Sequence, residues 1–309
     1  MGAAGLFGMT VPEGDGGQGL DYISYIIAVE EVARVDGSQA ATLAAAHSLG
    51  IFPIDRFGSE DQRRKYLPDL CQGKTLMGFG LTEPNAGSDA GATNTSAVKE
   101  GESWIINGRK TMTTNANTPM TKGSIVQAVT GMRPDGRPEY TCFIVENGTP
   151  GFSLNTLRRK LMWRGSNTAE LFFNNCRVSS DAVLGKPGDG FKQMLATLDG
   201  GSLSIAAMGL GCAQGAYEAA LRYAKERIQF GRPISKKQAI AFKLADMEVK
   251  LELARNLLYK ACWLAQNKRP FSKEAAMSKL YCSEIAKEVA DEAVQIHGGY
   301  GLFKEYEVE

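Results

Sequence analysis

The apolar positions near the start of the chain follow a helical period. In residues 21–35, DYISYIIAVEEVARV, the side chains of Ile23, Ile26, Ile27 and Val35 fall largely on one face of a helix. The stretch SQAATLAAAHSL that follows predicts a second helix. We therefore expect residues 1–75 to form a helical domain.

Between residues 76 and 185 the pattern changes to short apolar runs broken by turn signals. Asn107-Gly108 lies inside one such segment and Asn147-Gly148 follows another, and Asn-Gly is a common turn dipeptide. This pattern predicts a central β domain, of barrel or sandwich type. Pro187 and the glycines around it mark the exit from that domain.

Residues 186–309 return to a helical period. An apolar stripe of the helix-bundle type steps by four and three through Ile240, Leu244, Met247, Leu251, Ala254 and Leu258. A final helix is expected to start at Ser272, after a proline, and to stop at Gly298-Gly299, carrying Met277, Tyr281, Ile285 and Val289. Helices, then strands, then helices predict an α+β fold with segregated elements rather than a doubly wound sheet.

Composition narrows the function classes. The chain carries 35 basic and 34 acidic residues, a formal charge of +1, so no global field recruits nucleic acid or an anionic membrane. The start lacks a basic region and a long apolar run, and we expect no membrane span. Six scattered cysteines without a Cys-x-x-Cys pair and only two histidines argue against a zinc site, and reduced thiols fit a cytosolic-type compartment.

One motif carries more information than the rest of the chain. In GFGLTEPNAGSDA, residues 78–90, an apolar stretch runs into a glycine-bearing turn whose backbone amides suit an anion. Without further context it is a strand ending in an ordinary loop. The whole string, however, closely resembles the flavin-binding signature of the acyl-CoA dehydrogenase family. The resemblance implies FAD as cofactor, with contacts from Phe79, Leu81, Thr82 and Ser88.

A second segment, KTMTTN, is similar to the family strand whose hydroxyl residue reaches the reactive edge of the flavin ring. Thr114 takes that position, beside Thr113 and Met112. Relatives commonly carry Trp where this chain has Met112, and a thioether can still pack on a ring. Taken alone, the threonines reflect only β propensity.

Two helical segments resemble family contacts to the dinucleotide. In ERIQFGRPI, Arg227 is a forked donor suited to the FAD pyrophosphate, normally that of a neighbouring subunit, and the resemblance adds Gln229, Phe230 and Gln238. QIHGGYG resembles the family's Gln-x-x-Gly-Gly, which lets the backbone approach the dinucleotide. The residues implied are Gln295, Ile296, His297, Gly298 and Gly299. Taken alone, this is a helix ending at glycine.

The segment LDGGSLSIAA is similar to the start of a long helix that touches the pantetheine arm of the thioester. The implied substrate contacts are Ser88, Asp199, Gly200, Gly201 and Ser202. Relatives usually carry Arg at the position of Ser202, and some place the catalytic glutamate at the position of Gly201. RGSNTAELFF, residues 164–173, also looks like a family segment near the substrate channel.

The resemblance implies α,β-desaturation of a short- to medium-chain acyl-CoA with hydride transfer to flavin N5. It also implies an electron-transferring flavoprotein as partner, a dimer of dimers, and a cytoplasmic location, or the mitochondrial matrix in a eukaryote. The family's usual base, a glutamate in an IYEGTS-like motif, is expected beyond Glu309, so no catalytic residue and no metal ligand is assigned.

The chain resembles a family core with a partial N-terminal domain and a C-terminal bundle lacking its last helices. A fragment, an incompletely predicted gene and a naturally base-less paralogue all fit this pattern. Two other functions stay open: a base-less, desulfinase-like flavoprotein of the same superfamily, and a non-catalytic flavin-binding or assembly protein.

Overall fold

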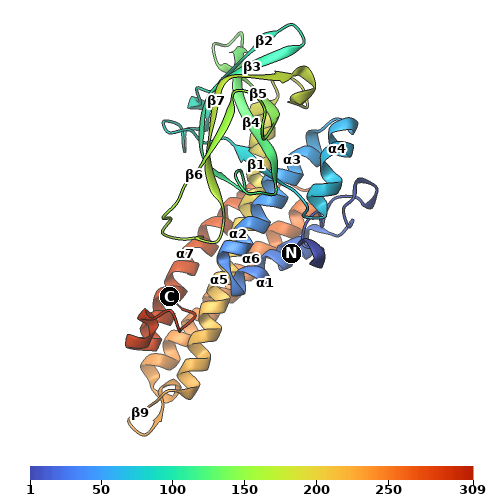
Figure 1. The fold of residues 1–309 in the computed structure, drawn as a ribbon. Helices are drawn as coiled ribbons and strands as arrows, with labels where there is room; N and C mark the ends of the chain where they lie inside the picture. The colour runs from blue at the N-terminus through green and yellow to red at the C-terminus, as the bar shows by residue number, and fades with distance from the viewer. Residues whose placement is uncertain (309) are drawn as a thin grey trace. The chain divides into compact units, whose positions relative to one another are not determined.

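A computed structural model describes residues 1–308. The chain divides into two compact units. The first comprises Met1–Leu20 and Thr42–Gly201, and the second comprises Asp21–Ala41 and Ser202–Glu309. Strands fill the middle of the chain and long helices follow them, so the predicted α+β class with segregated elements is confirmed (Figure 1).

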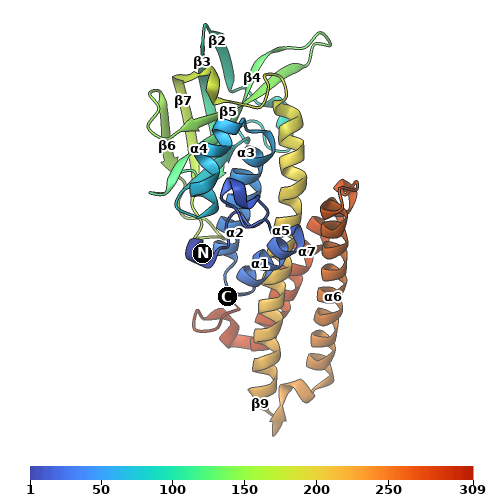
Figure 2. The same ribbon diagram turned by 90° about the vertical axis from the view of Figure 1, so that its right-hand side faces the viewer.

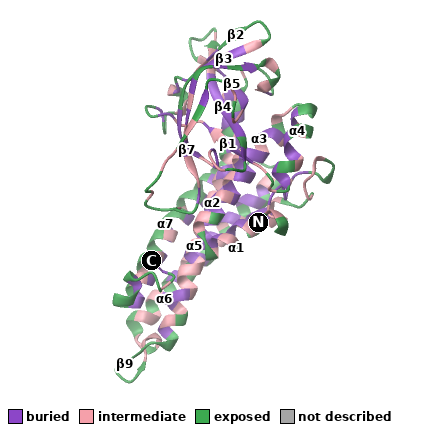
Figure 3. Cartoon of the chain, in the orientation of Figure 1, coloured by how far each residue is buried: buried purple, intermediate pink, exposed green. Residues whose placement is uncertain are grey.

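An eight-stranded sheet forms the centre of the first unit. Its strands run in the order β6-β7-β3-β2-β4-β5-β8, and β1 pairs in parallel with β4. Their bounds are β1 Leu76–Gly80, β2 Ser96–Glu100, β3 Ser103–Thr114, β4 Thr121–Met132, β5 Pro138–Glu146, β6 Phe152–Thr156, β7 Thr168–Ser179 and β8 Val183–Leu184. Trp104, Phe143 and Leu171 belong to the apolar core on this sheet, and Figure 3 shows β4 and β5 largely buried.

Two turn predictions have different outcomes. Asn147-Gly148 does form a turn after β5, with Gly148 at a φ of 88°. The prediction of a turn at Asn107-Gly108 is wrong, because both residues lie inside β3. A Cβ on Gly108 would lie 2.5 Å from Thr95 Oγ1, so the glycine serves a close approach at a β-bulge.

Short helices complete the first unit. They are α2 Gly37–Ala45, which begins in the second unit, the π-helical turn η3 Ala46–Ile51, α3 Phe52–Phe57 and α4 Glu60–Cys71. A capping box between Ser59 and Gln62 starts α4. Single 3-10 turns occupy Gly2–Ala4, Glu13–Asp15, Ala90–Ala92 and Ser180–Ala182.

Four long helices build the second unit. They are α1 Tyr22–Val35, α5 Gly190–Glu226, whose first residues belong to the first unit, α6 Gln238–Gln266 and α7 Ser272–His297. The hairpin of β9 Ile228–Gln229 and β10 Arg232–Pro233 and the turn Ile234–Lys236 link α5 to α6, and the turn η7 Gly298–Leu302 follows α7 (Figure 2).

The apolar stripe predicted for α6 is confirmed at five of its six positions, since Leu244, Met247, Leu251, Ala254 and Leu258 are buried. Ile240, at the N-terminal end of the helix, is half-buried. The predicted start and end of α7 are also confirmed, and Ile285 and Val289 are buried on it. Met277 of the same helix is instead 45% exposed.

The face predicted for α1 is wrong in part. Ile27 is 44% exposed and Val35 is 84% exposed. The buried face includes Glu30 instead, which accepts hydrogen bonds from Arg255 and from the Tyr259 hydroxyl at 2.6 Å. The apolar pattern alone could not show this, because the charge is neutralised by residues far away in the sequence.

Helix α5 is long and apolar enough, by length and composition alone, to cross a membrane. Half of its most apolar stretch is, however, buried inside the structure. Cβ atoms on Gly211 and Gly209 would lie 2.2 Å from Glu30 O of α1 and 2.8 Å from Cys282 O of α7. Its small residues therefore let the neighbouring helices approach closely.

Candidate functional site

The loop after β1, residues 81–92, carries most of the motif at residues 78–90, and we call it the signature loop. Leu81 and Thr82 are half-buried, and Ser88 is exposed. Phe79 lies within β1, partly buried. The loop thus begins after Gly80, the last residue of β1, and presents Ser88 to the surface.

A buried ion pair anchors the base of this loop. Lys110 Nζ of β3 donates to Glu83 Oε1 at 2.8 Å and to Leu81 O at 3.1 Å. The backbone N–H groups of Asn94 and Thr95 donate to the same carboxylate at 2.7 and 2.9 Å. The two charged side chains are 0% and 4% exposed. These four hydrogen bonds therefore tie the first residues of the signature loop, Leu81 and Glu83, to Lys110 of β3 and to the backbone just after the loop.

The electrostatics of Glu83 follow from these contacts. Burial by itself raises the pKa of the carboxyl group, but hydrogen bonds from Lys110, Thr95 and Asn94 outweigh burial and hold that pKa below its ordinary value. Glu83 and Lys110 each lie inside one of the quoted motifs, but neither was given a role from the sequence. The only signal in the sequence was a charged residue, Lys110, inside a predicted strand in which apolar and polar residues largely alternate.

Beside the loop, β3 contains a bulge. Its pairing with β7 shifts between Lys110 and Thr113, and Met112 adopts a φ of 56° with 69% of its surface exposed. Thr113 is buried and Thr114 is half-buried. The Thr111 N–H donates to Thr82 O at 2.8 Å, which joins this strand to the signature loop. The bulge therefore turns an apolar side chain outward next to the loop.

In the second unit a cavity of about 460 Å³ brings together residues from distant parts of the chain. It is lined by Tyr223, Arg227, Gln229, Ile234, Ile296, His297, Gly298, Gly299, Tyr300 and Phe303. Six of these were named from the sequence, in two separate segments. The other four lining residues are Tyr223, Ile234, Tyr300 and Phe303. Ile234 and Tyr300 lie inside the two quoted segments but were given no role from the sequence, and Tyr223 and Phe303 lie outside both segments.

The cavity offers both charge and open backbone. The Arg227 guanidinium is exposed and lies 5.6 Å from the centre of the Tyr300 ring. Cβ atoms built on Gly298 and Gly299 would meet nothing within 4 Å, and Gly298 has a φ of 61°. Backbone at this helix end is therefore accessible to a ligand, as close approach requires.

Ile296 and His297 contribute in a different way. Their side chains are only 4% and 5% exposed, and the His297 ring stacks on Tyr223 with centroids 4.3 Å apart. His297 Nδ1 also lies 2.8 Å from Ala293 O. The imidazole is thus held within the bundle, and the backbone is the part of this segment that borders the open space.

Three contacts predicted in the helical part of the chain lie outside the lining of this cavity. Phe230 is 91% exposed at the hairpin turn between β9 and β10, with a φ of 52°. Gln238 is exposed at the first position of α6, and Gln295 is exposed near the end of α7. Their role as cofactor contacts stays a prediction.

The predicted substrate contacts come from two elements. Ser88 lies on the signature loop, and Asp199, Gly200, Gly201 and Ser202 lie in the first part of α5. A Cβ on Gly201 would meet its nearest neighbours, Leu49 Cδ2 and Ser48 Oγ, at 3.8 Å. This position therefore has room for a Cβ atom. Among residues 1–308, no group of three His, Cys, Asp or Glu side chains could hold a metal ion.

Comparison of the sequence with curated proteins gives similar chains over its whole length. It is 51% identical over 309 residues to the probable acyl-CoA dehydrogenase YngJ of Bacillus subtilis, covering 100% of this chain and 81% of that one. It is 43% identical to the caffeyl-CoA reductase-Etf complex subunit CarC of Acetobacterium woodii, again covering 100% of this chain and 81% of the relative.

Solved structures show the same fold. Butyryl-CoA dehydrogenase from Megasphaera elsdenii matches with a TM-score of 0.95 and 44% identity, over 99% of this chain and 80% of that one. A glutaryl-CoA dehydrogenase from Mycobacterium smegmatis in complex with FADH2 matches with a TM-score of 0.93 and 32% identity, over 99% and 77% of the two chains.

Family models agree with both comparisons. The N-terminal, middle and C-terminal domains of acyl-CoA dehydrogenase match residues 1–74, 78–176 and 188–309. The chain therefore belongs to the acyl-CoA dehydrogenase family of oxidoreductases.

Proposed function

We propose that this chain binds FAD and forms the core of an enzyme that desaturates a short- to medium-chain acyl-CoA between Cα and Cβ. The observation that carries the proposal is the cavity in which Arg227 and Gln229 meet the open backbone of Gly298-Gly299. The butyryl-CoA dehydrogenase of M. elsdenii and the FADH2 complex of the M. smegmatis enzyme support the substrate class and the cofactor.

The residues present fit a flavin dinucleotide at two places. In the second unit, the Arg227 fork matches phosphate oxygens, and no Cβ obstructs the glycine backbone opposite. In the first unit, Met112 offers an exposed thioether on a bulge beside Thr114, which suits one face and one edge of an aromatic ring. When bound, the flavin supplies the hydride acceptor at N5.

The protein's own groups then have separate tasks. Lys110 and Glu83 hold the signature loop in place, so that Thr82 and Ser88 keep a fixed position. Met112 packs on the ring and excludes water from it, while the Thr114 hydroxyl hydrogen-bonds at its reactive edge. Asp199 and its neighbours at the start of α5 hold the pantetheine arm.

Desaturation also needs a base for the α-proton. We assign this role to none of residues 1–308. Electrons leave to an electron-transferring flavoprotein, a proposal supported by the Etf complex to which CarC belongs. We further propose a dimer of dimers, located in the cytoplasm or in the mitochondrial matrix.

The test is product analysis on the gene product that contains residues 1–309, loaded with FAD. Anaerobic incubation with butyryl-CoA and an electron acceptor is expected to yield the 2-enoyl-CoA and to transfer two electrons to the acceptor for each product formed. A yellow protein that forms no enoyl-CoA from any straight-chain acyl-CoA up to medium length contradicts the dehydrogenase proposal. A colourless protein that takes up no FAD contradicts flavin binding as well.

A second candidate, a flavoprotein that works without a glutamate, draws on the residues at the start of α5. Gly201 and Ser202 carry no charge where relatives place Glu or Arg. Gly201 has room for a Cβ atom, so Gly201→Glu tests this candidate: if a base is the missing element, the variant is expected to raise the rate of flavin reduction by butyryl-CoA. An unchanged rate would favour the base-less alternative.

A further inference from the structure

The loop between β6 and β7 encloses a cavity of about 700 Å³ that the proposed flavin and acyl-CoA contacts do not use. Its lining consists of Thr156, Leu157, Arg158, Arg159, Lys160, Arg164, Gly165, Ser166, Asn167 and Thr168. Four of these ten side chains are cations, and none is a carboxylate. In a chain whose net charge is only +1, this is a concentrated positive site.

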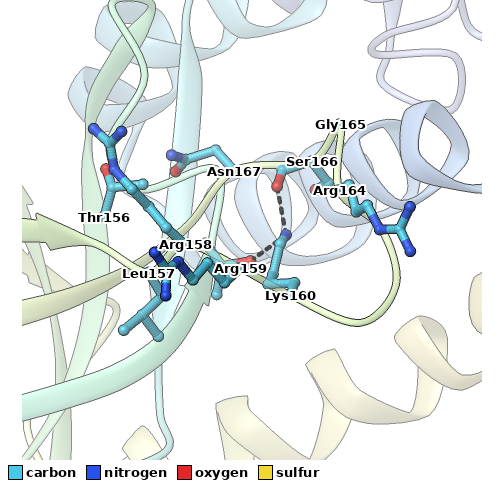
Figure 4. Close-up of a pocket in the computed structure, with 10 residues that line it drawn as sticks. Thr156, Leu157, Arg158, Arg159, Lys160, Arg164, Gly165, Ser166 and Asn167 are labelled. Atoms are coloured by element: carbon cyan, nitrogen blue, oxygen red, sulfur yellow. Dashed lines mark hydrogen bonds between the residues drawn. The ribbon is translucent and has the colours of Figure 1, made fainter.

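Hydrogen bonds hold the rim of this cavity at several points. Lys160 Nζ reaches across the loop and donates to Ser166 O and, at 2.9 Å, to Thr168 Oγ1 (Figure 4). The Leu157 N–H donates to Thr168 O at 2.8 Å. The Asn167 side chain donates to Asn117 O at 3.0 Å and accepts from the Asn117 N–H at 2.9 Å. Both ends of the loop are therefore fixed to the sheet and to the neighbouring β3–β4 connection.

Within this rim, the Arg158 and Arg159 side chains form no ion pair or hydrogen bond with any of residues 1–308. Figure 4 shows both on the side of the loop that carries Thr156 and Leu157, with Arg164 on the opposite side. Burial lowers the pKa of the Lys160 ammonium group, and no nearby carboxylate offsets it. Uncompensated guanidinium groups at a fixed rim suit a ligand that brings its own negative charge.

The backbone of the loop is also strained. Arg159 has a φ of 58° and Trp163 a φ of 50°, a region that residues other than glycine rarely adopt. Such strain costs free energy and is found disproportionately at ligand sites, where the surrounding contacts enforce it. At Arg159 the positive φ breaks the extended backbone that continues from β6.

We propose that this cavity binds a phosphate-bearing anion through Arg158 and Arg159. The planar guanidinium groups match phosphate oxygens in pairs, and the volume admits a group larger than a single phosphate, such as a pyrophosphate or a nucleotide. The site lies wholly within the first unit, between residues 156 and 168, and it does not depend on the proposed function.

The test is isothermal titration calorimetry of the FAD-saturated protein with inorganic pyrophosphate at low salt. Saturation with FAD keeps the probe away from the dinucleotide cavity at Arg227. We expect saturable binding that weakens as salt rises and that is at least about tenfold weaker in Arg158→Gln/Arg159→Gln. Circular dichroism of each variant confirms that it is folded. Arg158→Lys/Arg159→Lys, which keeps the charges but not the forks, is expected to fall between the two.

The matched control is Arg137→Gln/Arg177→Gln. It removes the same charge from two exposed arginines of the same unit, each of which pairs with its own carboxylate. This control is expected to bind pyrophosphate as the parent does. Equal losses in the two double variants, no saturable binding by the parent, or a loss caused by Arg227→Gln would each overturn the proposal.

Adenosine diphosphate as a second probe distinguishes the sources of the anion. Equal affinities for the two probes assign the site to free phosphates, and tighter binding of adenosine diphosphate assigns it to a nucleotide.

Discussion

Removing the charge of Lys110 tests whether the buried pair with Glu83 holds the first unit together. Lys110→Met deletes the 2.8 Å contact to the carboxylate and the 3.1 Å bond to Leu81 O, with both side chains almost fully buried. Breaking such a pair from one side typically costs about 3–5 kcal/mol. Two backbone N–H groups still donate to Glu83, so we expect a loss near the lower end, about 3 kcal/mol.

Urea unfolding in a Trp263→Phe background measures this loss. That substitution leaves Trp104 and Trp163, which both belong to the first unit, as the fluorescent reporters. Lys99→Met, an exposed lysine on β2, is the matched control and is expected to change the free energy of unfolding by less than about 0.5 kcal/mol. The double variant Glu83→Gln/Lys110→Met is expected to lose less than the sum of the single losses, because no buried charge is then left unpaired.

The pH dependence gives an independent check. The pKa of Glu83 in the folded protein lies below its ordinary value of 4.5. The ionised carboxylate therefore stabilises the folded state fully above pH 4.5, and this stabilisation is lost as the pH falls through the pKa of the folded protein. The deficit of Lys110→Met is therefore expected to be full near neutral pH and to shrink below about 4.5. A deficit under about 1 kcal/mol at neutral pH, or strictly additive losses in the double variant, would refute this reasoning.

Three further substitutions test other parts of the account. Met112→Ala changes an exposed side chain, so the free energy of unfolding should shift by less than about 0.5 kcal/mol. The FAD dissociation constant, measured by fluorescence titration, is expected to rise several-fold. An unchanged dissociation constant contradicts the proposed contact between Met112 and the flavin ring. Gly211→Ala places a methyl group 2.2 Å from Glu30 O, so a lower Tm is expected despite better helix propensity, and a higher Tm contradicts the close packing of α1 on α5. Burial opposes ionisation of Glu146, but hydrogen bonds from Lys65, Tyr66 and Lys122 lower its pKa to about 2. The Tm of the parent protein is therefore expected to fall between pH 4.5 and 2, and to fall less in Glu146→Gln. Parallel plots of Tm against pH for the two proteins would contradict this role of Glu146.

The helical period of the sequence was sufficient where burial follows the apolar residues. The stripe through Leu244, Leu251 and Leu258 is buried as predicted, because these positions share one face of a single long helix. On α1 the same reasoning misplaced Ile27 and Val35. There the buried face includes Glu30, whose charge is compensated by Arg255 and Tyr259, more than two hundred residues away in sequence.

The site shows a similar division. Motifs were sufficient to name Arg227, Gln229 and the segment around Gly298, which line one cavity although the chain between them is long. The sequence did not reveal the pairing of Lys110 with Glu83, since nothing local shows that a lysine on one strand reaches a loop carboxylate 27 residues earlier. The basic cavity of the β6–β7 loop was missed for the same reason, because it depends on how the two ends of the loop are fixed.

The most direct test of the central claim, a flavin dinucleotide held at Arg227, is the FAD affinity of Arg227→Gln against that of Arg222→Gln. Both variants remove one exposed arginine from the same part of the second unit, and Arg222 pairs only with Glu307 among the carboxylates of residues 1–308. We predict that Arg227→Gln binds FAD at least about tenfold more weakly than Arg222→Gln, which is the loss expected for a charge-assisted hydrogen bond to phosphate. The two variants are expected to bind FMN equally, because FMN has no pyrophosphate. Equal FAD affinities of the two variants would contradict the account.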